Sequence, residues 1–177
     1  NLFLYHSAQL ELGNALSVLG QFADAEAALR EANNTLPRLR TLKGWARRGD
    51  GSLRHNASVN AAFLERQGRH AEAERRRRSA LEDAKKHVEI LSSTLSPGNE
   101  SQFVRNAVRI VASTKVSLAD NLATQGKYGE AELYARSGLE ERLAMFGINT
   151  ADVSYALAVV GWTRFQQGDI ATAEKYY

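Results

Sequence analysis

The sequence contains no cysteine and only two prolines among its 177 residues. The absence of cysteine excludes disulfide bonds, thiolate catalysis and zinc sites with cysteine ligands. The scarcity of proline favours long helices, because proline interrupts the hydrogen bonding of a helix interior. No apolar run approaches the roughly 20 residues that a membrane-spanning helix needs. These absences remove several classes of site before any motif is considered.

The charge of the chain is small but unevenly placed. Hydrophobic residues make up 44% and charged residues 24% of the sequence, as in ordinary soluble domains. The net charge of +3 is made up of −3 over residues 1–37, +8 over residues 38–88 and −2 over residues 89–177. A basic segment between acidic ones is typical of a protein with an anionic partner.

A short unit occurs four times along the chain. In each unit a glycine is followed five residues later by Ala-Glu. A small residue stands seven positions before each glycine, and apolar residues recur at helical spacing, although Arg164 replaces leucine in the fourth unit. This pattern predicts a helix that ends at the glycine, followed by a second helix with glutamate in its first turn. The four glycines are Gly20, Gly68, Gly126 and Gly168.

The order of small residue, large residue, glycine, aromatic residue and alanine resembles the tetratricopeptide repeat. Phe22 and Tyr128 occupy the aromatic position, and Pro37 stands where that repeat closes. The resemblance implies an all-α fold, a right-handed superhelical solenoid of antiparallel helix pairs with about seven or eight helices. It implies one domain over residues 1–177, with units at about 6–37, 54–94, 101–145 and, incomplete, 150–177.

The intervals between units depart from the usual period of about 34 residues. The glycines are 48, 58 and 42 residues apart. The last interval, with Leu139-Glu140-Glu141-Arg142 before Phe146-Gly147, resembles the repeats of kinesin light chains and of bacterial regulatory proteins. The longer intervals predict elongated helices over about 71–94 and 101–125, with a turn at 96–99 between them.

Residues 35–52 allow two interpretations. Either the second helix continues to about Arg48 with a kink at Pro37, or a short separate helix begins near Pro37 with Thr35 as its cap. In both interpretations Gly49-Asp50-Gly51-Ser52 forms the next turn. Because the sequence stops shortly after Gly168 and a solenoid needs its terminal faces covered, we also expect a fragment of a longer array.

Candidates for partner binding follow from the resemblance, since the first helices of such pairs line a concave face that binds peptides. For some of these candidates a purely structural role is the alternative to partner binding. Asn14 is also compatible with a purely local hydrogen bond, and the aromatic residues near the C-terminus are compatible with packing against a further unit. The concave-face candidates are Asn14, Ser17, His55, Ser58, Ser117, Asp120, Tyr155 and Trp162.

Four consecutive arginines at 75–78 are the strongest feature of charge. Four consecutive residues span about 400° of a helix, so they do not share one face. They are compatible with a solvated helix that pairs with nearby acids, with a site for an acidic peptide or domain, or with nucleic-acid binding. Nucleic acid is least supported, because only Trp45 and Phe63 lie among the basic residues of 38–88 to stack on bases. The basic-patch candidates are Arg66, Arg69, Arg75, Arg76 and Arg78.

The sequence contains no HExxH, GxSxG, Walker or dinucleotide motif, so it predicts no catalysis, metal site or cofactor. We expect a scaffold or sensor that binds a protein or peptide partner, an acidic one in one interpretation. The alternatives are the regulatory repeat region of a larger bacterial enzyme, such as a protease or kinase, and nucleic-acid binding by residues 38–88. The cysteine-free composition is compatible with the cytoplasm.

Overall fold

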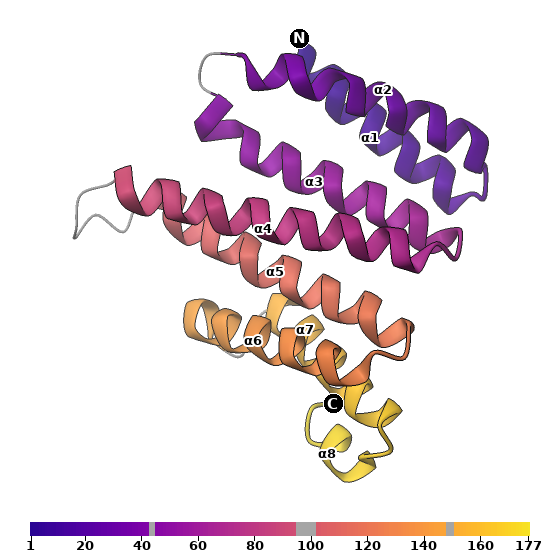
Figure 1. Ribbon diagram of the computed structural model, residues 1–177, viewed down its shortest axis with the longest axis vertical. Helices are drawn as coiled ribbons and strands as arrows, with labels where there is room; N and C mark the ends of the chain where they lie inside the picture. The colour runs from indigo at the N-terminus through magenta and orange to yellow at the C-terminus, as the bar shows by residue number, and fades with distance from the viewer. Residues whose placement is uncertain (43–44, 95–101, 148–150) are drawn as a thin grey trace. The chain divides into compact units, whose positions relative to one another are not determined.

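The computed structural model describes residues 1–42, 45–94, 102–147 and 151–177, and within these ranges it contains eight helices (Figure 1). None of these described helices is both long enough and apolar enough to cross a bilayer. The helices are α1 (Leu2–Val18), α2 (Phe22–Arg40), α3 (Trp45–Arg66), α4 (His70–Thr94), α5 (Gln102–Thr124), α6 (Tyr128–Phe146), α7 (Ala151–Gln166) and α8 (Ile170–Glu174).

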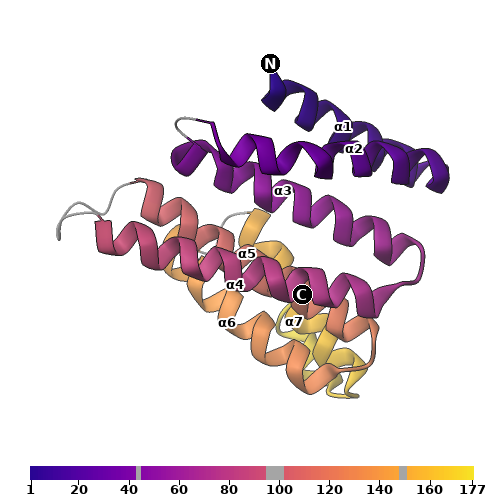
Figure 2. The same ribbon diagram turned by 45° about the horizontal axis from the view of Figure 1, so that its top comes forward.

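The contacts between residues divide the chain into two compact units, Asn1–Arg76 and Arg77–Tyr177. In the first unit α1 and α2 lie side by side in opposite directions, and both contact α3 (Figures 1 and 2). In the second unit α5 pairs with α6, and α7 contacts α5, α6 and α8. The pairs α1–α2, α5–α6 and α7–α8 are therefore those that the sequence predicts, whereas the boundary between the two units falls inside α4.

A glycine with a left-handed backbone ends the first helix of every pair. The four repeat glycines have φ between 74° and 83°, a conformation that costs glycine no Cβ clash. In each turn the N–H after the glycine donates to the carbonyl five residues earlier, which satisfies a helix-end carbonyl. These bonds are Gln21 to Leu16 at 2.9 Å, Arg69 to Leu64 at 2.9 Å, Lys127 to Leu122 at 2.9 Å and Asp169 to Arg164 at 3.0 Å.

The alanine five residues after each glycine anchors the second helix in the core. All four alanines are at most 2% exposed. In the first unit Ala25 packs with Leu10 and Phe63, and Phe63 meets the ring of Phe22 edge-on at 6.3 Å. In the second unit two clusters of buried aliphatic residues surround α5, one toward α4 and α6 and one toward α6 and α7. The repeated alanine thus marks where the paired helices touch.

The helices predicted over 71–94 and 101–125 are confirmed as α4 and α5. The turn predicted at 96–99 lies outside the described residues. The turn predicted at Gly49–Ser52 is wrong, because these residues lie inside α3. Each helical glycine costs about 1 kcal/mol relative to alanine, so the buried segment that follows, which includes Val59 and Phe63, must hold this part of the helix.

Neither interpretation of residues 35–52 was correct. Helix α2 passes through Pro37 without a new helix beginning there, and it ends at Arg40 rather than near Arg48. Thr35 is not a cap, because its hydroxyl donates to the carbonyl of Ala32 at 2.7 Å within the helix. Burial of Leu39, which is 0% exposed, offsets the hydrogen bond that Pro37 cannot donate.

A buried histidine joins α1 to α2. His6 is 0% exposed, and its Nδ1 lies 2.7 Å from the Thr35 hydroxyl. Because that hydroxyl already donates to Ala32, His6 Nδ1 is assigned as the N–H donor. Its Nε2 is buried and has no hydrogen-bond partner among the described residues. Burial therefore lowers the pKa of His6. A hydrogen bond from His6 Nδ1 to the Ala32 carbonyl, at 3.0 Å, partly opposes this shift.

We expect the chain to lose stability as the pH falls through about 6.5, the ordinary pKa of histidine. The unfolded chain takes up a proton there that folded His6 does not, so the free energy of unfolding decreases with falling pH. Urea unfolding near pH 7.5 and near pH 5.5 measures this dependence. In His6→Gln the dependence should be weaker than in wild type, whereas the control His87→Gln should retain it. An identical pH dependence in wild type and His6→Gln would contradict this account.

The paired helices approach most closely where a glycine faces the partner helix. A Cβ built at Gly138 of α6 would lie 2.9 Å from the carbonyl oxygen of Ala112 and 2.7 Å from a methyl group of Val116, both in α5. Real Cβ atoms do not approach a backbone atom this closely. By contrast, Gly129, in the first turn of the same helix, has no atom within 4 Å of its Cβ position.

Gly138→Ala should therefore lower the free energy of unfolding by about 1–3 kcal/mol, because the helices must move apart. Gly129→Ala is the matched control and should leave stability unchanged or raise it by up to about 1 kcal/mol, since alanine is the better helix former. Chemical denaturation of both variants measures the difference. Equal responses would show that α5 and α6 do not pack as closely as described.

Candidate functional site

In the first unit, α3 binds the polar face of α1 through one arginine. Arg66 Nη1 donates to Asn14 Oδ1 and to Ser17 Oγ, both at 3.2 Å. Ser17 is 2% exposed, whereas Arg66 is exposed. Two concave-face candidates and one basic-patch candidate thus form a single cluster. Solvent therefore reaches Arg66 and part of Asn14, but hardly any of Ser17.

A second polar contact between the same two helices lies on α3 about three turns before Arg66. His55 Nε2 lies 2.8 Å from Glu11 Oε1, with both side chains at least 43% exposed. Ser58 is exposed one turn further along α3. The predicted residues of α1 and α3 therefore form a polar surface on the first unit, already joined by hydrogen bonds.

In the second unit, the predicted residues bring a carboxylate and aromatic rings together. Tyr155 of α7 donates its hydroxyl to Asp120 Oδ2 of α5 at 3.1 Å. Ser117 lies one turn before Asp120 and is partly exposed. Further along α7, the rings of Trp162 and Phe165 stack with their centroids 6.0 Å apart. This surface is apolar along α7 and acidic at Asp120.

The remaining basic-patch candidates have different surroundings. Arg69 forms a bidentate pair with Glu72, at 2.6 Å and 2.7 Å. The hydrogen bond from Arg69, together with the charges of Arg69, Arg75 and Arg76, lowers the pKa of Glu72. Arg75 and Arg76 are exposed.

Arg78 has a different environment within the second unit. It pairs with Glu130 of α6 at 2.7 Å and lies 6.0 Å from the ring centroid of Tyr134. Part of the positive charge of the arginine run is therefore neutralised within the chain.

Sequence reasoning missed a polar cluster between α2 and α3. Asn33 Nδ2 donates to Asn60 Oδ1 at 3.1 Å, and Asn56 Nδ2 donates to Asn33 Oδ1 at 2.9 Å. Asn60 is 5% exposed. A signal was present, because Asn60 stands eight residues before its glycine, where the other units have Leu12, Leu118 and Val160.

No metal centre is assembled in the described part of the chain, where no three histidine or acidic side chains are grouped to hold an ion.

Comparison with protein-family models and with curated proteins finds no match. Among solved structures, the chain is similar to BtubC (BKLC) from P. vanneervenii, a kinesin-light-chain-like tetratricopeptide-repeat protein. The TM-score is 0.68 at 24% sequence identity. The match covers 93% of this chain but 56% of BtubC, so this chain spans little more than half the length of that protein.

This likeness concerns the fold. It confirms the all-α helical-repeat fold predicted from the sequence, which is similar to that of a kinesin-light-chain-like tetratricopeptide-repeat protein. The activity and partners of BtubC are not transferred by a likeness at this identity.

The contact of Arg66 with Ser17 should be measurable as a coupling energy. In a double-mutant cycle of Arg66→Ala and Ser17→Ala, we expect about 0.5–1 kcal/mol of coupling in the free energy of unfolding, because the hydrogen bond is charge-assisted but partly exposed. The matched control is a second cycle that combines Arg66→Ala with Ser58→Ala, a change at an exposed serine of α3, and its coupling should be near zero. A coupling near zero in both cycles would mean that Arg66 does not hold α1 in solution.

Proposed function

We propose that this chain is a non-catalytic protein-interaction module that binds a peptide or partner domain through the first helices of its pairs. The tetratricopeptide-like fold supports this class of function, since these folds are typically scaffolds. The observation on which the proposal chiefly rests is the aromatic surface of α7. The acidic character of the partner remains a prediction.

Three large aromatic side chains of α7 are exposed. Tyr155, Trp162 and Phe165 are 43%, 40% and 50% exposed. Trp162 stands seven positions, or about two helical turns, after Tyr155, so both side chains lie on one face of the helix. Large aromatic residues on a surface are the residue types that most often dominate the energy of protein interfaces.

The surroundings of these rings favour a peptide that is itself partly apolar. The stacking of Trp162 on Phe165 limits the freedom of both rings before a partner arrives, which lowers the entropic cost of binding. The hydrogen bond to Asp120 similarly fixes the ring of Tyr155. A partner would cover the rings and meet Asp120 at one end, where its own polar groups have an acceptor.

The two alternatives have less support. For nucleic-acid binding, Arg69 and Arg78 are already paired with Glu72 and Glu130. A regulatory role beside a protease or kinase domain concerns the protein beyond these residues, and no described contact favours it. We therefore retain the interaction module as the proposed function.

Selection of a random peptide library on the immobilised chain tests the proposal. Peptides that bind the wild type should bind Trp162→Ala at least about tenfold more weakly, as expected for an aromatic hot spot. Leu133→Ala is the matched control, because Leu133 is a 72% exposed apolar residue on the second helix α6. It should leave peptide affinity unchanged.

Circular dichroism of both variants separates binding from folding. Retained helicity with lost binding supports the proposal. Lost helicity in Trp162→Ala would instead assign Trp162 to the packing of the unit, and unchanged affinity would exclude α7 as the binding surface.

A further inference from the structure

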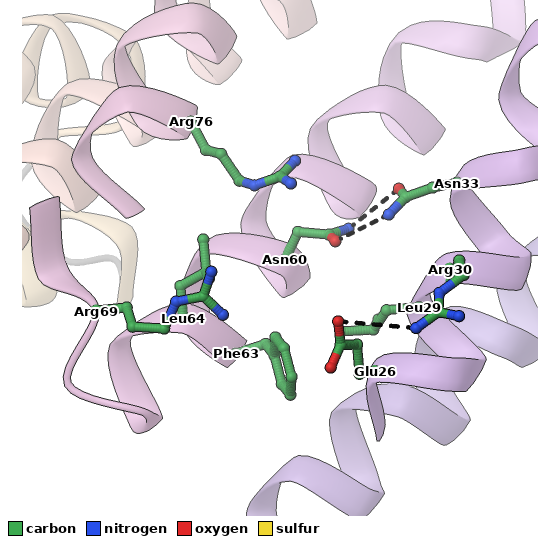
Figure 3. Close-up of a pocket in the computed structure, with 9 residues that line it drawn as sticks. All are labelled: Glu26, Leu29, Arg30, Asn33, Asn60, Phe63, Leu64, Arg69 and Arg76. Atoms are coloured by element: carbon green, nitrogen blue, oxygen red, sulfur yellow. Dashed lines mark hydrogen bonds and ion pairs between the residues drawn. The ribbon is translucent and has the colours of Figure 1, made fainter. Parts of the chain in front are cut away.

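A pocket of about 180 Å³ lies in the first unit between α2, α3 and the beginning of α4 (Figure 3). Sites for drug-sized ligands usually measure about 300–1,000 Å³. This pocket is smaller and has room for about one amino-acid side chain. It lies in the other unit from the aromatic surface of α7, so the two sites can be tested separately.

Arginines surround the pocket. Arg30 lies on α2, Arg69 in the turn after α3, and Arg76 on α4. Figure 3 shows the side chain of Arg76 extending toward the Asn33–Asn60 pair. Arg30 pairs only loosely with Glu26, at 3.8 Å, and its side chain is 67% exposed. An exposed pair of this kind contributes little and can be exchanged for another carboxylate at low cost.

The net charge around the pocket favours a carboxylate over a phosphate. Glu26 lines the pocket beside Arg30, and Glu72 holds Arg69 by two hydrogen bonds. The three arginines and these two glutamates leave a local charge of about +1, which suits a single carboxylate better than a phosphate with a charge of about −2. Arginine also presents a planar fork that matches a carboxylate.

The walls of the pocket complete the recognition of a side chain rather than a free ion. Leu29, Phe63 and Leu64 are each at most 6% exposed and provide an apolar wall for methylene groups. Asn33 uses one of its two amide hydrogens on Asn60, so the other is available to a bound group. Asn60 is itself fixed by a hydrogen bond to the carbonyl of Asn56 at 2.8 Å.

We propose that this pocket binds an acidic side chain of a peptide partner, with its carboxylate on Arg76 and Arg30 and its methylene groups against Phe63 and Leu29. Arg30 and Arg76 of this site lie on the second helices α2 and α4, and the pocket is separate from the aromatic surface of α7 on which the proposed function chiefly rests. It gives Arg76 of the basic segment a defined ligand class, a carboxylate held by arginine beside an apolar wall.

The test uses nuclear magnetic resonance on the full chain with a small probe, N-acetyl-glutamate N-methylamide. Because a single side chain forms few contacts, we expect a dissociation constant of about 1–10 mM. The side-chain amide signals of Asn33 and Asn60 should shift during the titration. The isosteric probe N-acetyl-glutamine N-methylamide should bind at least about fivefold more weakly, because it lacks the charge.

Two variants with the same loss of charge locate the site. Arg76→Gln should weaken binding of the glutamate probe about fivefold or more. Arg75→Gln should leave it unchanged, because Arg75 is an exposed neighbour that does not line the pocket. Both substitutions are on the surface of α4, so neither is expected to unfold the chain.

The possible outcomes separate the proposal from simpler explanations. Equal affinity for the two probes, equal effects of the two variants, or no shift up to about 50 mM probe would each overturn it. Acetate or phosphate that reproduces the full shifts at the same concentration would identify a site for small anions and overturn the assignment to a peptide side chain. These outcomes are independent of Trp162 and α7, so they leave the proposed function to its own test.

Discussion

The close approach of paired helices is the constraint on which the rest of this structure depends. At Gly13 a Cβ would lie 3.2 Å from the carbonyl oxygen of Ala25, and at Gly138 a Cβ would collide with α5. Ala61 of α3 and Ala119 of α5 stand at the repeat position that Gly13 has in α1, and both are fully buried. Because the backbones come this close, a left-handed glycine must reverse the chain within two or three residues. The larger aliphatic residues are then displaced to the flanks, where they form the cores.

Polar residues break the apolar pattern of the repeat where they have a partner in another helix. Arg164 stands where the other units have leucine, and it pairs with Glu132 of α6 and with Asp169 of the next turn. Glu132 also accepts from Arg136 at 2.8 Å. Asn60 similarly replaces an aliphatic residue and joins the amide cluster of α2 and α3. Each exception thus exchanges hydrophobic burial for hydrogen bonds that are specific to one pair of helices.

The sequence predicts those features of the fold that depend only on residues close together in the chain. The glycine turns, the buried alanines and the limits of α4 and α5 follow from backbone conformation and periodicity, which neighbouring residues determine. The segment around Pro37 and Gly49 was not predictable in this way. There the local preferences oppose a helix, and the burial of Leu39 and of the later part of α3 outweighs them. Such an outcome depends on contacts between residues far apart in the sequence.

The candidate sites also depend on contacts between residues far apart in the sequence, and these could not be predicted. The types of residue at the surface, such as Asn14, Arg66 and Trp162, could be selected from the repeat, but their partners could not. A basic segment in the sequence predicts one positive surface, whereas in the structure Arg66 turns to α1 and Arg69 to Glu72. Arg76 lines a pocket whose amides come from α2 and α3. Charge along a helix is therefore distributed by the helices that pack beside it. The +8 charge of residues 38–88 is better understood as several separate arginine sites than as one patch.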